Sequence, residues 1–213
     1  MTEIIYNETT EQWQELAKNF HSDWDQNTGE YTVYCTDGMI TKNGVETKYS
    51  TGLEFELNED GESYSVVGIG TCEETEIVIP AIHEGKRVTA IGEYAFANYS
   101  TSFSITIPNT VTSIESYAFT FCNLNSISIP DSVTSIGDYA FSYCYGLTKI
   151  TIPDSVTSIG SRAFSYSNKL TEIFYQGSIA QWKEIEKDSH WDADSSISCV
   201  YCEDGALRGK EYF

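Results

Sequence analysis

Residues 124–146 read LNSISIPDSVTSIGDYAFSYCYG, and residues 147–169 read LTKITIPDSVTSIGSRAFSYSNK. These two consecutive 23-residue units are identical at 15 positions. A weaker copy covers residues 104–122, and a fourth begins at Ile77 and ends at an Ala-Phe pair. The four Ala-Phe pairs begin at positions 95, 118, 140 and 163, a spacing of 22 or 23 residues. A fixed period of this length indicates a solenoid, in which neighbouring units bury each other's apolar faces.

The residues of one unit predict the shape of one rung. Residues 150–152 alternate apolar and polar side chains, which is typical of a strand with one buried face. Pro153 ends this strand because it has no N–H to donate, and residues 156–159 form a second short extended piece. Residues 161–164 are too short for a helix and are interpreted as a helical turn that buries Ala163 and Phe164. Parallel strands lie about 4.8 Å apart, so equivalent residues form ladders.

The repeat pattern I/L-x-I-P-x-S/T-V-T-x-I-x-x-x-A-F-x-x-C covers residues 77–172 and resembles the BspA-type leucine-rich repeat family. The resemblance implies a right-handed leucine-rich solenoid of short, parallel, stacked strands with helical turns. It also implies protein binding without enzymatic activity, often on bacterial surfaces. Glu115 departs from the pattern, because glycine follows the isoleucine in the other units.

A second duplication joins the two ends of the chain. Residues 4–6, 11–16 and 34–38 match residues 173–175, 180–185 and 201–205, and each copy reads strand, short helix, strand. Thr9 or Thr10 and Ser178 are the expected helix caps. The C-terminal copy is predicted to cover the last rung, because an open solenoid end exposes apolar surface and a strand edge. The N-terminal copy follows no solenoid, so it is either the cap of a lost array or a segment with a new use.

Four segments follow from these patterns. Residues 1–45 form the N-terminal module, 46–76 contain a hairpin with strands near 53–57 and 63–69, 77–172 hold four repeats, and 173–213 form the cap. Residues 81–87 are an insertion in the first repeat and are expected to protrude as a loop. The N-terminal module, with two short strands, is too small to stand alone. It is expected to dock on the hairpin or to pair with another chain, which leaves a monomer or a weak homodimer.

The chain is strongly acidic, with a formal net charge of −20, and its first 60 residues carry 13 acidic and three basic side chains. This charge opposes direct nucleic-acid binding, because phosphates would be repelled, and it suits a partner with a basic surface. No apolar run is long enough to predict a membrane span. Residues 1–6 lack the pattern of a secretion signal, so the chain as written is expected in the cytoplasm, or at the cell surface or secreted if it was trimmed.

Catalytic and metal sites are not predicted. Cys122 and Cys144 share one repeat position and are expected to be reduced and buried. Cys199 and Cys202 form a C-x-x-C in a strand, where residues three apart face opposite sides. Residues 23–29 alternate acidic and amide side chains like a calcium loop, but the glycine is one place late and tyrosine replaces the bidentate glutamate. The three histidines lie in different modules. No cofactor or metal is expected.

A partner-binding surface is predicted on the outer side of the turns. Residues four apart there flank each Ala-Phe pair and should stack into an aromatic stripe. Its expected members are Tyr94, Tyr117, Phe121, Tyr139, Tyr143, Arg162 and Tyr166. Acidic residues near the hairpin turn and the first rung should steer a basic partner, namely Glu59, Asp60, Glu62, Glu73 and Glu74. The alternative is a purely structural role, in which these rings only cover the edges of the rungs.

Three functions remain open from the sequence. The first is a non-enzymatic protein-interaction module of bacterial or phage type. The second is an acidic intracellular inhibitor that occupies a basic nucleic-acid-binding cleft, as anti-defence proteins do. The third is a fragment of a cell-surface adhesin.

Overall fold

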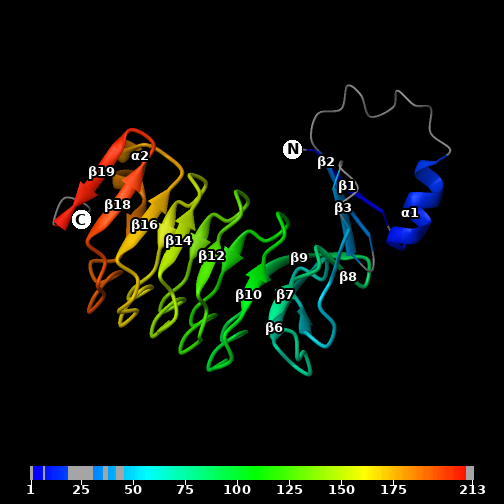
Figure 1. Cartoon of the computed structure of the whole chain (residues 1–213), viewed down its shortest axis with the longest axis horizontal. Helices are drawn as coiled ribbons and strands as arrows, with labels where there is room; N and C mark the ends of the chain where they lie inside the picture. The colour runs from blue at the N-terminus through cyan, green and yellow to red at the C-terminus, as the bar shows by residue number, and fades with distance from the viewer. Residues whose placement is uncertain (1, 7, 19–30, 36–37, 42–45, 210–213) are drawn as a thin grey trace.

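The computed structural model describes residues 2–6, 8–18, 31–35, 38–41 and 46–209. An array of rungs occupies the middle of the molecule, and the two related modules lie toward opposite ends (Figure 1). The Asp, Asn and Gly positions 23–29, which resemble a calcium loop, lie outside the described residues, as do His21 and Trp24.

Each rung contributes one strand to each of two β faces, and all the strands within a face run parallel. The strands of the first face are β7 (Glu76–Val78), β10 (Ser104–Thr106), β12 (Ser126–Ser128), β14 (Lys149–Ile152), β16 (Glu172–Tyr175) and β18 (Cys199–Cys202). The strands of the second face are β9 (Lys86–Ile91), β11 (Ser113–Ile114), β13 (Ser135–Ile136), β15 (Ser158–Ile159) and β17 (Glu186–Lys187). A single bridge between Phe103 and Leu124 links β7–β10 to the rest of the first face.

The third side of the solenoid consists of turns. In the rung of Tyr139, the N–H groups of Ala140 and Ser142 each bond to a carbonyl three residues back. The N–H groups of Tyr139, Phe141 and Tyr143 instead donate to the next rung. The expected helical turn is therefore a pair of overlapping turns. Alternate N–H groups point toward the next rung because they satisfy the backbone carbonyl groups of that rung.

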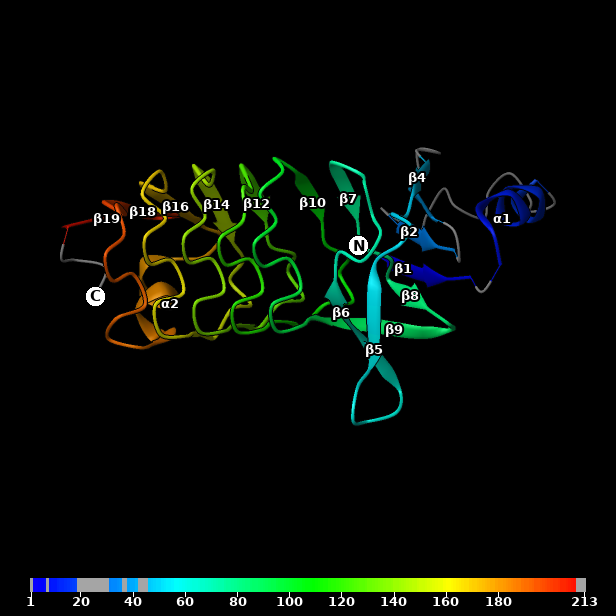
Figure 2. The same ribbon diagram turned by 90° about the horizontal axis from the view of Figure 1, so that it is seen from below.

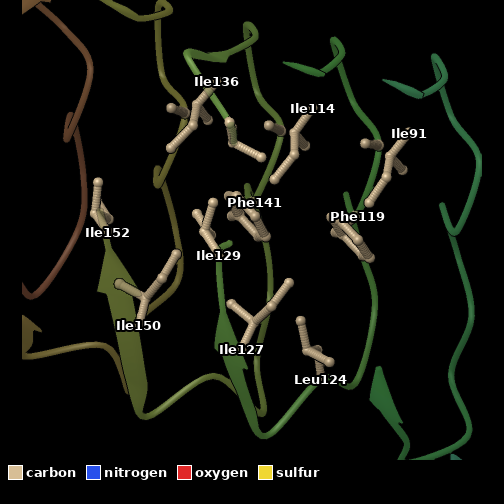
Figure 3. Packing of buried hydrophobic residues seen from close by; sticks show 14 of the residues in the cluster. Ile91, Ile114, Phe119, Leu124, Ile127, Ile129, Ile136, Phe141, Ile150 and Ile152 are labelled. Atoms are coloured by element: carbon tan, nitrogen blue, oxygen red, sulfur yellow. The ribbon is translucent and has the colours of Figure 1, made fainter. Parts of the chain in front are cut away.

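Equivalent side chains form the ladders that the repeat predicts. Ile127 pairs with Ile150 in the first face, and Ile114 pairs with Ile136 in the second (Figure 3). Four phenylalanines stack along the third side at centroid separations of 5.1–5.6 Å, namely Phe96, Phe119, Phe141 and Phe164. All four are at most 1% exposed, and one continuous core runs from Leu53 to Leu207.

The C-terminal module continues the array and then closes it. β16 pairs with β14, and β17 pairs with β15, so this module begins as a fifth rung. Helix α2 (Ile179–Glu184) follows β16 and buries Trp182 completely. β19 (Gly205–Arg208) then pairs antiparallel with β18 and ends the sheet. The predicted cap is confirmed, and its packing explains why the last apolar rung is not left open.

The N-terminal module repeats this design at the other end. Its elements are β1 (Thr2–Ile5), α1 (Thr10–Ala17), β2 (Tyr31–Tyr34), β3 (Gly38–Thr41) and β4 (Glu46–Lys48). β1 and β2 are parallel and β2 and β3 antiparallel, as are β16, β18 and β19. Thr9 and Ser178 each form a capping box, which confirms both predicted caps. The sheet has four strands rather than the expected two, because β3 and β4 extend it.

The hairpin of β5 (Glu54–Leu57) and β6 (Ser63–Gly68) forms as predicted and projects from the body of the solenoid (Figure 2). β6 also pairs parallel with β9, so the hairpin opens the second face.

The insertion in the first repeat is a second hairpin, in which β8 (Ile82–His83) pairs with β9. The expectation of a protruding loop is wrong, because Ala81 and Ile82 are buried against Tyr34 and Met39 of the N-terminal module. Docking within the chain therefore occurs, but this apolar contact joins the module to the insertion rather than to the hairpin of residues 53–69.

Candidate protein-binding surface

The predicted aromatic stripe forms two ladders on the outer side of the turns. Tyr94, Tyr117 and Tyr139 stack at 4.8 Å between ring centroids, within 11° of parallel. In the second ladder, Tyr143 stacks between Phe121 and Tyr166 at 4.3 and 4.6 Å. Tyr94 is 53% exposed and Phe121 is 45% exposed, whereas the inner members are half-buried by their neighbours. The structure thus brings the six predicted rings together as two columns.

The backbone presents these rings in an uncommon conformation. All seven residues predicted for the stripe have φ between 53° and 60°, in the left-handed region. Bulky side chains avoid this region when they are free to choose. Here it is enforced by the turns, because the N–H of Tyr117 donates to Asp138 O and that of Phe121 donates to Ser142 O in the next rung. The rings are therefore held on a rigid backbone.

The C-terminal end of the stripe is polar. The guanidinium of Arg162 lies 3.6 Å from the carboxylate of Asp194. A hydrogen bond to Asp194 also raises the pKa of Tyr166 above its usual value. Arg162 is thus partly neutralised by the cap, and the stripe carries little positive charge.

A shallow groove runs beside the first ladder, across the strands of the second face. Its floor consists of Ser113, Ser135, Ser158 and the adjoining isoleucines and glycines. A Cβ added to Gly137 would lie 2.6 Å from Ser116 N, so the floor there must remain backbone. The groove begins at Glu93 and ends at Glu186 and Asp188. Four strand spacings separate β9 from β17, which corresponds to about 19 Å.

The groove is acidic at both of its ends. A second hollow at its N-terminal end shares Glu93 and Glu115 and adds Glu56, Glu59 and Tyr94. No lysine or arginine lines either hollow within the part of the chain that the structure describes. Backbone donation from His190 lowers the pKa of Asp188, which keeps this carboxylate ionised.

Lys187 lies between two groove acids but does not neutralise them. Its Nζ donates to Trp182 O and to Ile185 O, at 2.5 and 2.9 Å, and lies 4.9 Å from the Trp182 ring centroid. Burial lowers the pKa of Lys187 to about 8. The amine is thus turned inward, away from the acids on either side of it.

The five predicted acids do not form one cluster. Glu59, Asp60 and Glu62 are exposed at the tip of the β5–β6 hairpin, and only Glu59 reaches the groove. Hydrogen bonds within the turn, first from the Glu62 N–H, lower the pKa of Asp60. Glu73 and Glu74 lie at the other end of the hairpin, where Glu74 accepts hydrogen bonds from Ser50 and Thr51.

Sequence reasoning missed Glu56, Glu93, Glu115, Glu186 and Asp188. One signal was present, because Glu115 stands where glycine follows the isoleucine of the other units. Glu93 and Glu115 come from neighbouring rungs, and Glu186 and Asp188 come from the cap. Only the stacking of the rungs places them along one line.

The predicted burial of Cys122 and Cys144 is confirmed. Cys122 and Cys144 are buried and free, with their sulfur atoms 3.5 Å apart. Burial raises the pKa of the Cys144 thiol well above its usual value. Cys199 and Cys202 are also free, and only Cys202 packs against the main core, so the two residues face opposite sides.

The described residues contain one arrangement that superficially resembles a catalytic triad. Ser189 Oγ lies 2.9 Å from His190 Nδ1, and Asp188 Oδ1 lies 3.4 Å from the same nitrogen. A nucleophile and an orienting acid must contact opposite ring nitrogens, so these three residues cannot relay a proton. His83 is instead stacked on Phe55 at 4.0 Å.

Two other features are absent from the described residues, namely a metal-binding cluster and a membrane-spanning helix. No group of three or more His, Cys, Asp or Glu side chains is placed to hold a metal ion among the described residues. The helices within the described residues are too short and too polar to cross a membrane.

Comparison with known proteins identifies the repeat. The family model described as "BspA type Leucine rich repeat region (6 copies)" matches residues 70–189, which is more than half of the chain. Among curated proteins, none matches the sequence significantly.

Solved structures of similar shape include a leucine-rich repeat protein of T. pallidum, with 23% identity, a TM-score of 0.47 and coverage of 58% of this chain and 68% of that one. A leucine-rich cell surface protein of Faecalibacterium prausnitzii is 25% identical, with a TM-score of 0.46 and coverage of 72% and 54%. The pneumococcal vaccine antigen PcpA is 22% identical, with a TM-score of 0.48 and coverage of 73% and 40%. The chain therefore spans about half the length of the last two proteins or less.

Proposed function

This chain belongs to the BspA-type leucine-rich repeat family, and on that premise we propose that it is a non-enzymatic scaffold that binds a basic segment of another protein. The proposed site is the acidic groove of the second face together with the tyrosine ladder beside it. The observation that supports this proposal most is the position of the groove carboxylates next to a ladder of stacked tyrosines, of which Tyr94 is 53% exposed.

The size and charge of the groove suit an extended peptide. An extended chain advances about 3.3 Å per residue, so a groove of about 19 Å accepts roughly six residues. Carboxylates at both ends favour lysine or arginine side chains on the ligand. The rings add apolar area that loses little side-chain entropy on binding, as tyrosine does in antibody paratopes.

The residues predicted for the surface receive different roles in this proposal. Tyr94, Tyr117 and Tyr139 contact the ligand, and Phe121, Tyr143, Tyr166 and Arg162 extend the surface outward. Glu59 belongs to the groove, whereas Asp60 and Glu62 act at longer range from the hairpin tip. Glu73 and Glu74 lie away from the groove, so their charge should matter least.

The test uses fluorescein-labelled hexa-arginine as the probe and hexa-glutamate as its charge control. Fluorescence anisotropy at low and physiological salt should show binding of hexa-arginine alone, weakening as salt screens the carboxylates. The double variant Glu93→Gln/Glu115→Gln should weaken binding clearly. Glu73→Gln/Glu74→Gln removes the same charge from outside the groove and serves as the matched control.

A further double variant separates the contribution of the rings from that of the charges. Replacing Tyr117 and Tyr139 by Ala should speed dissociation about 30-fold from a protein partner, because hot-spot truncations cost ~2 kcal/mol or more. The salt dependence of binding by this double variant should stay unchanged. The proposal fails if hexa-arginine binds both charge variants equally well, and the hydroxyl-rich outer side of the first face then becomes the next candidate.

The acidic groove also supports a second candidate function, that of an inhibitor. An acidic scaffold that covers a basic nucleic-acid-binding cleft should compete with nucleic acid for the same partner. Once a partner is isolated, a displacement assay with labelled nucleic acid separates a simple scaffold from an inhibitor of this kind.

A further inference from the structure

The two modules can be compared residue by residue. Ile4 corresponds to Ile173, Trp13 to Trp182, and Leu16 to Ile185. The match extends to ring geometry, because Tyr6 and Trp13 meet at 5.2 Å and 66°, and Tyr175 and Trp182 meet at the same distance and angle. The N-terminal module therefore resembles the C-terminal cap in ring geometry as well as in sequence.

The caps differ in what their first strand contacts. β16 lies between β14 and β18, so the preceding rung occupies its outer edge. β1 lies at the edge of its sheet and, within the described ranges, pairs with β2 alone. An unpaired strand edge is a template for another strand.

The hydrogen-bonding groups at this edge face outward. Tyr6 N donates to Tyr34 O of β2, so the N–H and C=O of Ile5, one residue away, point to the open side. In the C-terminal cap, Gln176 N donates to Ile152 O at the end of β14. By the same alternation, Phe174, the equivalent of Ile5, turns its backbone groups toward β14.

Apolar side chains near this edge are exposed where their counterparts are covered. Leu16 is 40% exposed, whereas Ile185 is 6% exposed. Ile5 is 38% exposed, and Ile4 is half-buried where Ile173 is fully buried. The differences coincide with the side on which the C-terminal cap contacts its array.

We propose that the outer edge of β1, together with Leu16, binds the terminal strand of a second leucine-rich array of the same repeat type, supplied by a partner molecule. The strand adds parallel to β1, as β14 adds to β16, and buries Leu16. The strand register supports this occupant, because Ile150 of β14 pairs with Ile173, and Ile4 is the residue of β1 that corresponds to Ile173.

The experiment titrates the ¹⁵N-labelled full chain with a synthetic peptide of residues 147–154, LTKITIPD, and follows the amide resonances. The control peptide has serine at the positions of Ile150 and Ile152. We expect saturable shifts at Glu3, Ile5 and Leu16 with the first peptide, and none of these with the second. The amides of β18 and β19 should stay unchanged.

Variants at one position isolate the strand edge. Ile5→Pro removes the outward N–H without touching the bonds to β2, and Ile5→Thr keeps it. Ile5→Pro should weaken binding at least about tenfold, and Ile5→Thr much less. Leu16→Glu should also weaken binding, and it tests the surface independently if Ile5→Pro prevents the module from folding.

Three results would overturn the proposal. The first is no peptide-dependent shift at millimolar peptide. The second is binding that both Ile5→Pro and Leu16→Glu leave intact, because the peptide would then lie elsewhere. The third is a concentration-dependent dimer, without peptide, that Ile5→Pro abolishes, since a second copy of this chain would then occupy the edge. None of these results bears on the groove.

Discussion

Removal of the Phe141 ring tests the packing of the solenoid most directly. Phe141 is fully buried and stacks on both neighbours, with centroids 5.1 Å from Phe119 and 5.6 Å from Phe164. Phe141→Ala should lower the free energy of unfolding by about 3–5 kcal/mol, because rigid rungs on both sides cannot close the cavity. About 0.5–1.5 kcal/mol of that loss comes from each stacked ring pair.

Phe121→Ala is the matched control. It also removes one phenyl ring, but from the outer ladder, where Phe121 is 45% exposed and stacks on a single neighbouring ring, Tyr143, among the described residues. Its cost should stay below about 1 kcal/mol, as for surface substitutions in general.

Urea denaturation followed by tryptophan fluorescence measures both variants. A single transition with an unchanged slope is expected, because each rung is stabilised by its neighbours. If Phe141→Ala cost less than 1 kcal/mol, or no more than Phe121→Ala, the assignment of this column to a tightly packed core would be refuted.

Two further predictions concern buried titratable groups. Native Cys122 and Cys144 should resist a thiol reagent until denaturant is added, because both are at most 1% exposed, and a disulfide between them in the purified protein would contradict this. Lys187 has a pKa of about 8 in the folded chain, below the ordinary 10.5, so the unfolded state binds more protons between these values and stability should rise with pH across that window. Urea melts from pH 8 to 10 should show this rise relative to Lys187→Met, and identical pH profiles would count against it.

The sequence alone determined the repeat, the ladders and both caps, because each depends on local pattern. Ile150 and Ile152 alternate in any extended strand, and Pro153 ends it whatever surrounds it. Cys122 and Cys144 share one repeat position, so stacking of the units places them next to each other in neighbouring rungs. The capping residues Thr9 and Ser178 could likewise be found from the sequence, since a capping box involves only four consecutive positions.

Only the tertiary structure decided where the acidic groove and the open strand edge lie. Glu93 and Glu186 are 93 residues apart in sequence and line one groove because the rungs stack between them. The docking of Tyr34 on Ile82 and the open edge of β1 depend in the same way on how separate segments meet. Long-range proximity of this kind depends on how the rungs pack and twist against one another, which no local pattern encodes.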